Sequence, residues 1–146
     1  MRRFRFRLDS LLRVRSQVER TARKALAVAM AEVHTFDQQL EAASRGLADC
    51  EAQAARADSV GHLARGLEDG LRRHRWRLTR QREQAEQRLE AVRVDYTEKA
   101  RELKTMQRLR DQEHERWRTE TLRQEQAELD ELAVLTRSGA PGDESW

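Results

Sequence analysis

The sequence predicts an all-α protein, built as a long antiparallel two-helix coiled-coil hairpin. Three observations point to this fold class. Charged and apolar residues each make up 38% of the 146 residues and aromatic residues only 5%, which is too polar a balance for a rounded globular core. The one proline is Pro141, so almost nothing before it interrupts a helix. Apolar residues also recur with a heptad period on both sides of a glycine-containing stretch.

The first helix is expected over about residues 10–57, with Asp9 or Ser10 as its cap. A heptad frame places apolar residues at both core positions: Leu12, Leu26, Val33, Leu40, Leu47 and Ala54 at a, and Leu8, Ala22, Ala29, Phe36, Ala43, Cys50 and Ala57 at d. Within this frame only Arg15 and Glu19 are charged. The pattern therefore predicts one continuous amphipathic helix.

A hairpin turn is expected over about residues 58–66, where glycines weaken the helical pattern. The second helix then covers about residues 66–136, with a second heptad frame: Leu71, Leu78, Ala85, Val92 and Met106 at d, and Leu89, Tyr96, Leu103 and Trp117 at a. A register that places Val33 opposite Val92 matches large with small side chains, and a slip of one heptad remains open. Residues 1–137 would form this hairpin, and residues 138–146 a disordered tail.

The charge distribution and the cysteine content indicate a solvent-exposed helical surface and a reducing compartment. The net charge of +3 is the difference between 29 basic and 26 acidic residues that are interleaved along the chain, as on a solvated helix surface. Cys50 is the one cysteine, so an intrachain disulfide is excluded and a reducing cytoplasm fits. No run of about 18 apolar residues predicts a membrane span.

Motifs for catalysis, nucleotide binding or metal binding are missing from the sequence. Neither a phosphate-binding loop nor a dinucleotide-binding glycine motif occurs, and no histidine has a second His or Cys three or four residues away. A two-helix hairpin also offers no obvious pocket in which the pKa values of carboxylates would separate. We therefore expect a non-enzymatic protein without a cofactor or metal.

Two arginine-rich stretches predict binding surfaces. They are RRFRFR at residues 2–7 and RRHRWRLTRQR at residues 72–82. Alternating arginine and aromatic residues can bind phosphates and stack on bases, so a basic coiled coil that binds nucleic acid is one alternative. Arginine and tryptophan are also typical anchors of protein interfaces, and no nucleic-acid-binding fold accompanies them. A protein partner is the favoured interpretation.

The two ends of the chain resemble the FliJ family of flagellar type III export proteins. Phe4-Arg5-Phe6-Arg7-Leu8, followed by Leu11-Leu12-x-Val14-Arg15, is similar to the F-x-F-x-L-x-x-L-L-x-x-R opening of that family. Lys104-x-Met106-x-x-Leu109, with the later Glu125-Gln126-x-x-Leu129-Asp130-Glu131-x-Ala133, is similar to its charged closing helix.

The resemblance implies a coiled-coil stalk, similar to that of the ATP synthase gamma subunit. Such a stalk binds the flagellar export ATPase hexamer, contacts the membrane export gate and escorts export chaperones in the cytoplasm, in peripheral association with the inner membrane. The residues that would bind the ATPase ring are Phe4, Phe6, Leu8, Leu11, Val14, Arg15, Trp117, Gln126 and Asp130. Those that would bind the gate or a chaperone are Arg72, Arg73, Arg75 and Trp76. The equivalent stalk of an injectisome is the close alternative, and the oligomeric state stays open.

Overall fold

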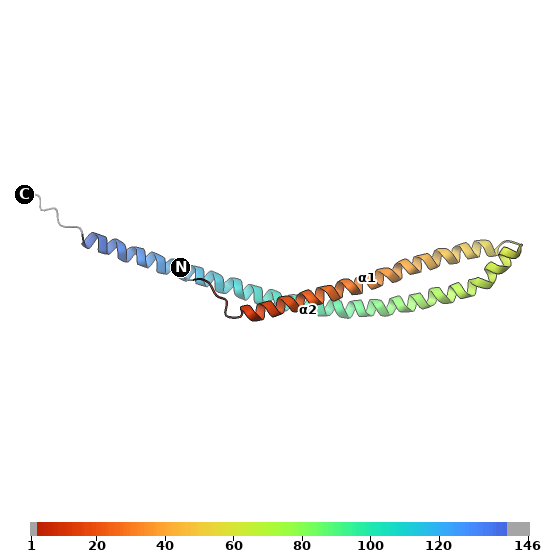
Figure 1. Cartoon of the computed structure of the whole chain (residues 1–146), viewed down its shortest axis with the longest axis horizontal. Coiled ribbons are helices and arrows are strands. Elements are labelled where there is room, and N and C mark those ends of the chain that lie inside the picture. The colour runs from red at the N-terminus through yellow and green to blue at the C-terminus, as the bar shows by residue number, and fades with distance from the viewer. Residues whose placement is uncertain (1–2, 140–146) are drawn as a thin grey trace, which may run out of the picture. The chain divides into compact units, whose positions relative to one another are not determined.

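Two helices make up almost all of the computed structural model, which describes residues 3–139 (Figure 1). Helix α1 spans Asp9–Ala54 and helix α2 spans Ser59–Ser138. No strand occurs within residues 3–139, so the all-α prediction is confirmed. By their internal contacts the residues form two compact units. We call residues 15–101 the hairpin unit, and residues 1–14 with 102–146 the terminal unit.

In the hairpin unit, α1 and α2 run side by side in opposite directions (Figure 1). The buried apolar side chains are small, or are leucines: Ala22, Ala29, Leu47 and Cys50 from α1, and Ala64, Leu78, Ala85 and Leu89 from α2. Apart from Ala64, all of them occupy the a and d positions that the heptad frames assign. Small side chains let the two helices approach closely, and interdigitation with leucine fills the seam. The predicted coiled-coil pairing is thus confirmed.

The turn of the hairpin lies at residues 55–58, before the expected range of 58–66. Asp58 starts α2, because its Oδ1 accepts a hydrogen bond from the backbone N–H of Gly61 at 3.1 Å and its backbone oxygen accepts one from His62 at 3.2 Å. The glycines expected to end the helical pattern are therefore inside α2. A good cap and tertiary packing outweigh the weak helix propensity of glycine here.

Close contact between the turn and the first residues of α2 requires a glycine at position 61. A Cβ atom at Gly61 would lie 2.0 Å from the backbone oxygen of Arg56, so any side chain would displace the backbone of the turn. Arg65 of α2 also contacts the end of α1: its Nη1–H donates to the backbone oxygen of Ala54 at 2.5 Å. That bond satisfies a carbonyl which the end of α1 would otherwise leave without a partner.

The register of the helices differs from the expected one by about one heptad. Arg82 pairs with Asp37, and Arg88 Nη2 lies 2.6 Å from Glu32 Oε1. The expected register would instead have placed Arg88 opposite Asp37. Because the turn lies nearer the N-terminus than expected, Glu32 and Asp37 of α1 face earlier residues of α2 than the expected register gives them. The correction remains within the one-heptad slip that the sequence left open.

Glu19 is a buried carboxylate in the hairpin unit, with a residue exposure of 4%. Its Oε1 accepts hydrogen bonds from Nε of Arg23 at 3.1 Å and from Nη2 at 2.5 Å. The pKa of Arg23 is raised, first by the hydrogen bond that it donates to Glu19, then by the charge of Glu19, with a smaller contribution from Tyr96 on α2. The Glu19 carboxylate can therefore be buried in the seam, because Arg23 one turn away donates hydrogen bonds to it and compensates its charge.

Arg23→Gln should lower the melting temperature of the hairpin by about 2–4 °C, measured by circular dichroism at neutral pH. The physical reason is that the buried Glu19 carboxylate would lose its cation. Since the folded pKa of Arg23 lies above its unfolded value, the stability that this raised pKa contributes is fully present at neutral pH and is lost only as the pH rises through the folded value. Adding Glu19→Gln should restore part of the loss. A double variant less stable than Arg23→Gln alone would contradict this account.

The terminal unit holds the beginning of α1 and the last part of α2. The N-terminal segment 3–8, which we call the strap, has no regular secondary structure and ends in a turn whose Asp9 N–H donates to the oxygen of Phe6 at 3.2 Å. Phe6 is buried at 8% exposure. Helix α2 continues to Ser138, two residues beyond the expected end and into the expected tail of residues 138–146, of which 140–146 lie outside the described residues.

Candidate functional site

Three aromatic rings fix the strap to α2 in the terminal unit. The ring of Phe4 meets that of His114 edge-on, with centroids 4.9 Å apart, and lies 5.7 Å from the ring of Trp117. His114 and Trp117 are 5.8 Å apart and three residues apart in sequence, so they share a face of α2. We call these three residues the strap cluster. It joins the N-terminal motif that resembles the FliJ opening to helix α2.

The predicted ring-binding residues at the N-terminus differ in accessibility. Phe4 and Trp117 are brought together and are half-buried, whereas Phe6 is buried and can only support the strap. Leu8 is also half-buried. Leu11 and Val14 are 41% and 58% exposed, so they offer open apolar surface on the first turns of α1. Arg15 is half-buried and belongs to the hairpin unit.

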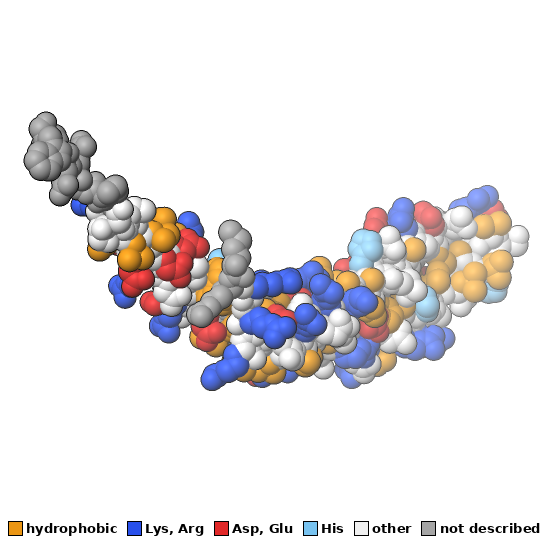
Figure 2. Space-filling model, turned by 60° about the vertical axis from the view of Figure 1, so that its left-hand side comes forward, with side chains coloured by type: hydrophobic (Ala, Val, Ile, Leu, Met, Phe, Trp, Pro, Cys, Tyr) orange, Lys and Arg blue, Asp and Glu red, His pale blue; other side chains and the backbone are white. Residues whose placement is uncertain are grey.

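The two predicted residues near the C-terminus, Gln126 and Asp130, are not brought to the strap cluster. Both are exposed, and Gln126 Nε2 donates to Asp130 Oδ1 at 3.3 Å along the same helix. Exposed leucines accompany them at positions 122, 129 and 132. In Figure 2, apolar and acidic side chains lie beside each other near the C-terminal end of α2. This segment is an acidic amphipathic helix without a partner among the described residues.

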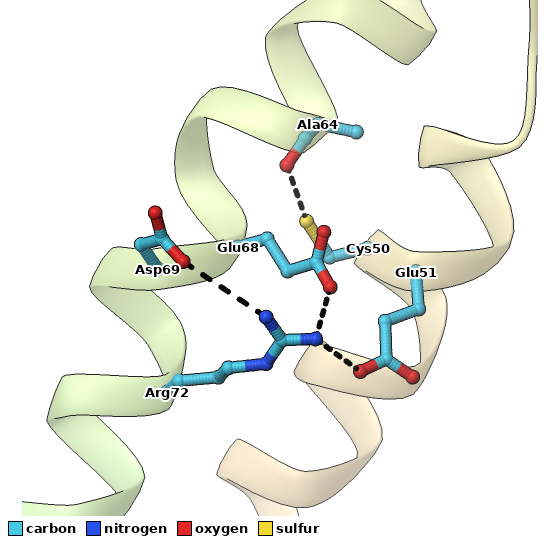
Figure 3. A network of polar contacts seen from close by, with 6 residues as sticks. All are labelled: Cys50, Glu51, Ala64, Glu68, Asp69 and Arg72. Atoms are coloured by element: carbon cyan, nitrogen blue, oxygen red, sulfur yellow. Dashed lines mark hydrogen bonds and ion pairs between the residues drawn. The ribbon is translucent and has the colours of Figure 1, made fainter.

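Arg72, the first of the predicted gate-binding residues, is engaged inside the hairpin unit (Figure 3). Its guanidinium pairs with Glu68, lies 3.4 Å from Glu51 Oε1 of α1, and lies 3.9 Å from Asp69. Nearby, the buried Cys50 thiol donates to the oxygen of Ala64 at 2.9 Å. Arg72 therefore bridges the two helices, and its charge is largely compensated. Cys50 is a packed core residue, as its d position indicates.

Trp76 is the most accessible aromatic side chain of the described chain, at 63% exposure. The guanidinium of Arg80 lies 5.5 Å from its ring centroid, in cation–π contact. Arg73 and Arg75 are exposed beside it. Position 76 is half a helical turn from the buried Leu78, so this surface faces away from α1. We call Arg73, Arg75, Trp76 and Arg80 the tryptophan face.

Sequence reasoning missed His114, which was considered only as a metal ligand. Its position three residues before Trp117 was the available signal, because residues at this spacing share a helix face. Among the described residues, no three His, Cys, Asp or Glu side chains come together as metal ligands would. Neither helix of that same part of the chain has an apolar stretch able to cross a bilayer.

The arrangement supplies contact surfaces: an anchored aromatic strap, open apolar residues and a tryptophan face. A comparison with protein families matches residues 4–140 to the family described as flagellar FliJ protein. Comparisons with curated proteins and with solved structures found no match.

Proposed function

Since this chain belongs to the FliJ family of flagellar type III export proteins, we propose that it serves there as a non-enzymatic stalk. It binds the ring of the export ATPase, couples that ring to the membrane export gate and escorts export chaperones. It would work in the cytoplasm, in peripheral association with the inner membrane. The family membership covers the terminal unit and the hairpin unit alike.

The observation that carries the ring-binding role is the strap cluster with its open apolar neighbours. Phe4 and Trp117 hold the strap against α2, which leaves Leu11 and Val14 exposed on the same unit. Exposed apolar side chains at the end of a charged helix are typical of surfaces that a partner covers. A ring of identical subunits can bind such a surface while the many charges nearby orient the encounter.

Changing Leu11 and Val14 to Asp should abolish stimulation of the cognate export ATPase, measured as the rate of ATP hydrolysis at increasing stalk concentration. Both residues are exposed, so helicity should stay at the wild-type level. The matched control is Val28→Asp, at an α1 position that is 70% exposed but lies in the hairpin unit. If the Leu11 and Val14 variant stimulated the ATPase as well as the control, the ring would bind elsewhere.

The tryptophan face is our proposed contact for the gate or a chaperone. Trp76→Ala should weaken binding to the cytoplasmic part of the gate or to a chaperone by about tenfold, since exposed tryptophans flanked by arginine are frequent hot spots. Stimulation of the ATPase should be unchanged. Pull-down and titration calorimetry measure the two effects. Retention of wild-type protein on RNA at physiological salt, lost in Trp76→Ala, would favour the nucleic-acid alternative instead.

A further inference from the structure

A hollow in the terminal unit gathers four arginines around a single carboxylate. It has a volume of about 520 Å³ and is lined by Arg3, Phe4, Arg5, Phe6, Asp9, Arg13 and Arg110. The strap, the first turns of α1 and helix α2 each contribute to it. We call it the arginine hollow. Its volume is within the range of small-molecule sites in proteins.

Among residues 3–139, carboxylates balance only part of the positive charge in the arginine hollow. Arg13 pairs with Asp9, its Nη2 lying 3.1 Å from Oδ2. Within residues 3–139, no carboxylate pairs with Arg3, Arg5 or Arg110. About three positive charges therefore remain around one concave surface. Like charges held this close repel each other, and a bound anion would relieve that repulsion.

The strap holds two of these arginines in place through its aromatic residues. Phe6 is buried, and Phe4 is held by His114 and Trp117. Anchoring of the two phenylalanines therefore fixes the backbone that carries Arg3 and Arg5. Arg3 and Arg5 are exposed side chains on a segment that these aromatic contacts hold against α2.

We propose that the arginine hollow binds a phosphate-bearing anion. Guanidinium groups bind phosphate oxygens in a bidentate manner, and a di- or triphosphate concentrates several negative charges in a small volume. A single carboxylate carries one charge and would leave most of the hollow uncompensated. Two sources share this chemistry: a soluble polyphosphate compound and the headgroup of an anionic phospholipid. The proposal concerns the chain alone and does not depend on the export ATPase.

The test is calorimetric titration of the full chain with tripolyphosphate, and co-sedimentation with vesicles of phosphatidylglycerol and phosphatidylcholine. Changing Arg3, Arg5 and Arg110 to Gln should weaken binding by about tenfold or more, because three charge-assisted contacts are lost. The matched control changes Arg108, Arg116 and Arg118 to Gln. These are exposed arginines of the same unit outside the hollow, and binding should change by less than about threefold.

Binding of tripolyphosphate would identify a soluble source, and binding of the phosphatidylglycerol vesicles alone would identify a lipid source. Three outcomes would overturn the proposal: no binding to either probe, equal losses in the two triple variants, or tighter binding of a glutamate peptide than of tripolyphosphate. Circular dichroism checks that both triple variants are folded. If the Gln variant of the hollow did not fold, Lys at the same three positions keeps the charge without the guanidinium fork and should bind with an intermediate loss.

Discussion

Replacing Gly61 with alanine should destabilise the hairpin by about 2–3 kcal/mol, because the added Cβ has no space. The atom it would meet, at 2.0 Å, is the backbone oxygen of Arg56, which cannot rotate away as a flexible side chain would. Either the turn at residues 55–58 must shift, or the cap from Asp58 to the N–H of Gly61 must lengthen. Thermal and urea unfolding followed by circular dichroism measure the change.

Gly66→Ala is the matched control for Gly61→Ala. It lies one and a half turns further along α2, and a Cβ at this position meets nothing within 4 Å. Alanine should therefore stabilise the helix by about 0.5–1 kcal/mol, since it loses less backbone entropy than glycine on folding. The two substitutions should thus have opposite signs. Equal effects would show that helix propensity, and not close contact at the turn, determines the outcome at Gly61.

The fold class and the core positions were predictable because they depend on a repeated signal. Each heptad adds an independent observation, and the buried residues Ala22, Ala29 and Leu78 are all at predicted positions. The turn depends on a few local contacts. Glycine at 61 suggested a break in the helix, whereas the cap from Asp58 and the close contact with Arg56 make it the third residue of α2.

The register and the buried Glu19 could not be predicted from the heptads alone. Arginine and glutamate are so frequent that almost any register offers ion pairs, so the pairing of Arg88 with Glu32 is not specified by composition. In the heptad frame Glu19 is one of two charged residues at core positions. Its burial depends on Arg23 being one turn away, with a further contribution from Tyr96 of the other helix.

At the candidate site, local pattern predicted the residue types but not their environment. The alternation of Arg and Phe indicated an extended segment, and Phe4 does meet Trp117. Which aromatic residue would be buried, and that Arg110 of α2 would join Arg3 and Arg5, depends on contacts between residues more than 100 positions apart. Long-range contacts of this kind leave no periodic signal in a single sequence.

Changing Phe4 and Phe6 to Ala should release the strap and reduce binding of the export ATPase ring by about tenfold or more. The strap is outside both helices, so far-UV circular dichroism should be almost unchanged. Release would remove the ring of Phe4 from Trp117, and the fluorescence of Trp117 should report this in a background of Trp76→Phe and Trp146→Phe. Sedimentation with the ATPase hexamer measures binding.

Phe36→Ala is the control for this loss of aromatic side chains, since Phe36 is half-buried in the hairpin unit. It should lower the melting temperature of the hairpin while leaving the Trp117 signal and ring binding unchanged. Loss of helicity in the Phe4 and Phe6 variant would mean that both rings are core residues on which the terminal unit depends. Unchanged ring binding with an altered Trp117 signal would separate the strap from the partner surface, and would leave Leu11 and Val14 as the contacts that the ring requires.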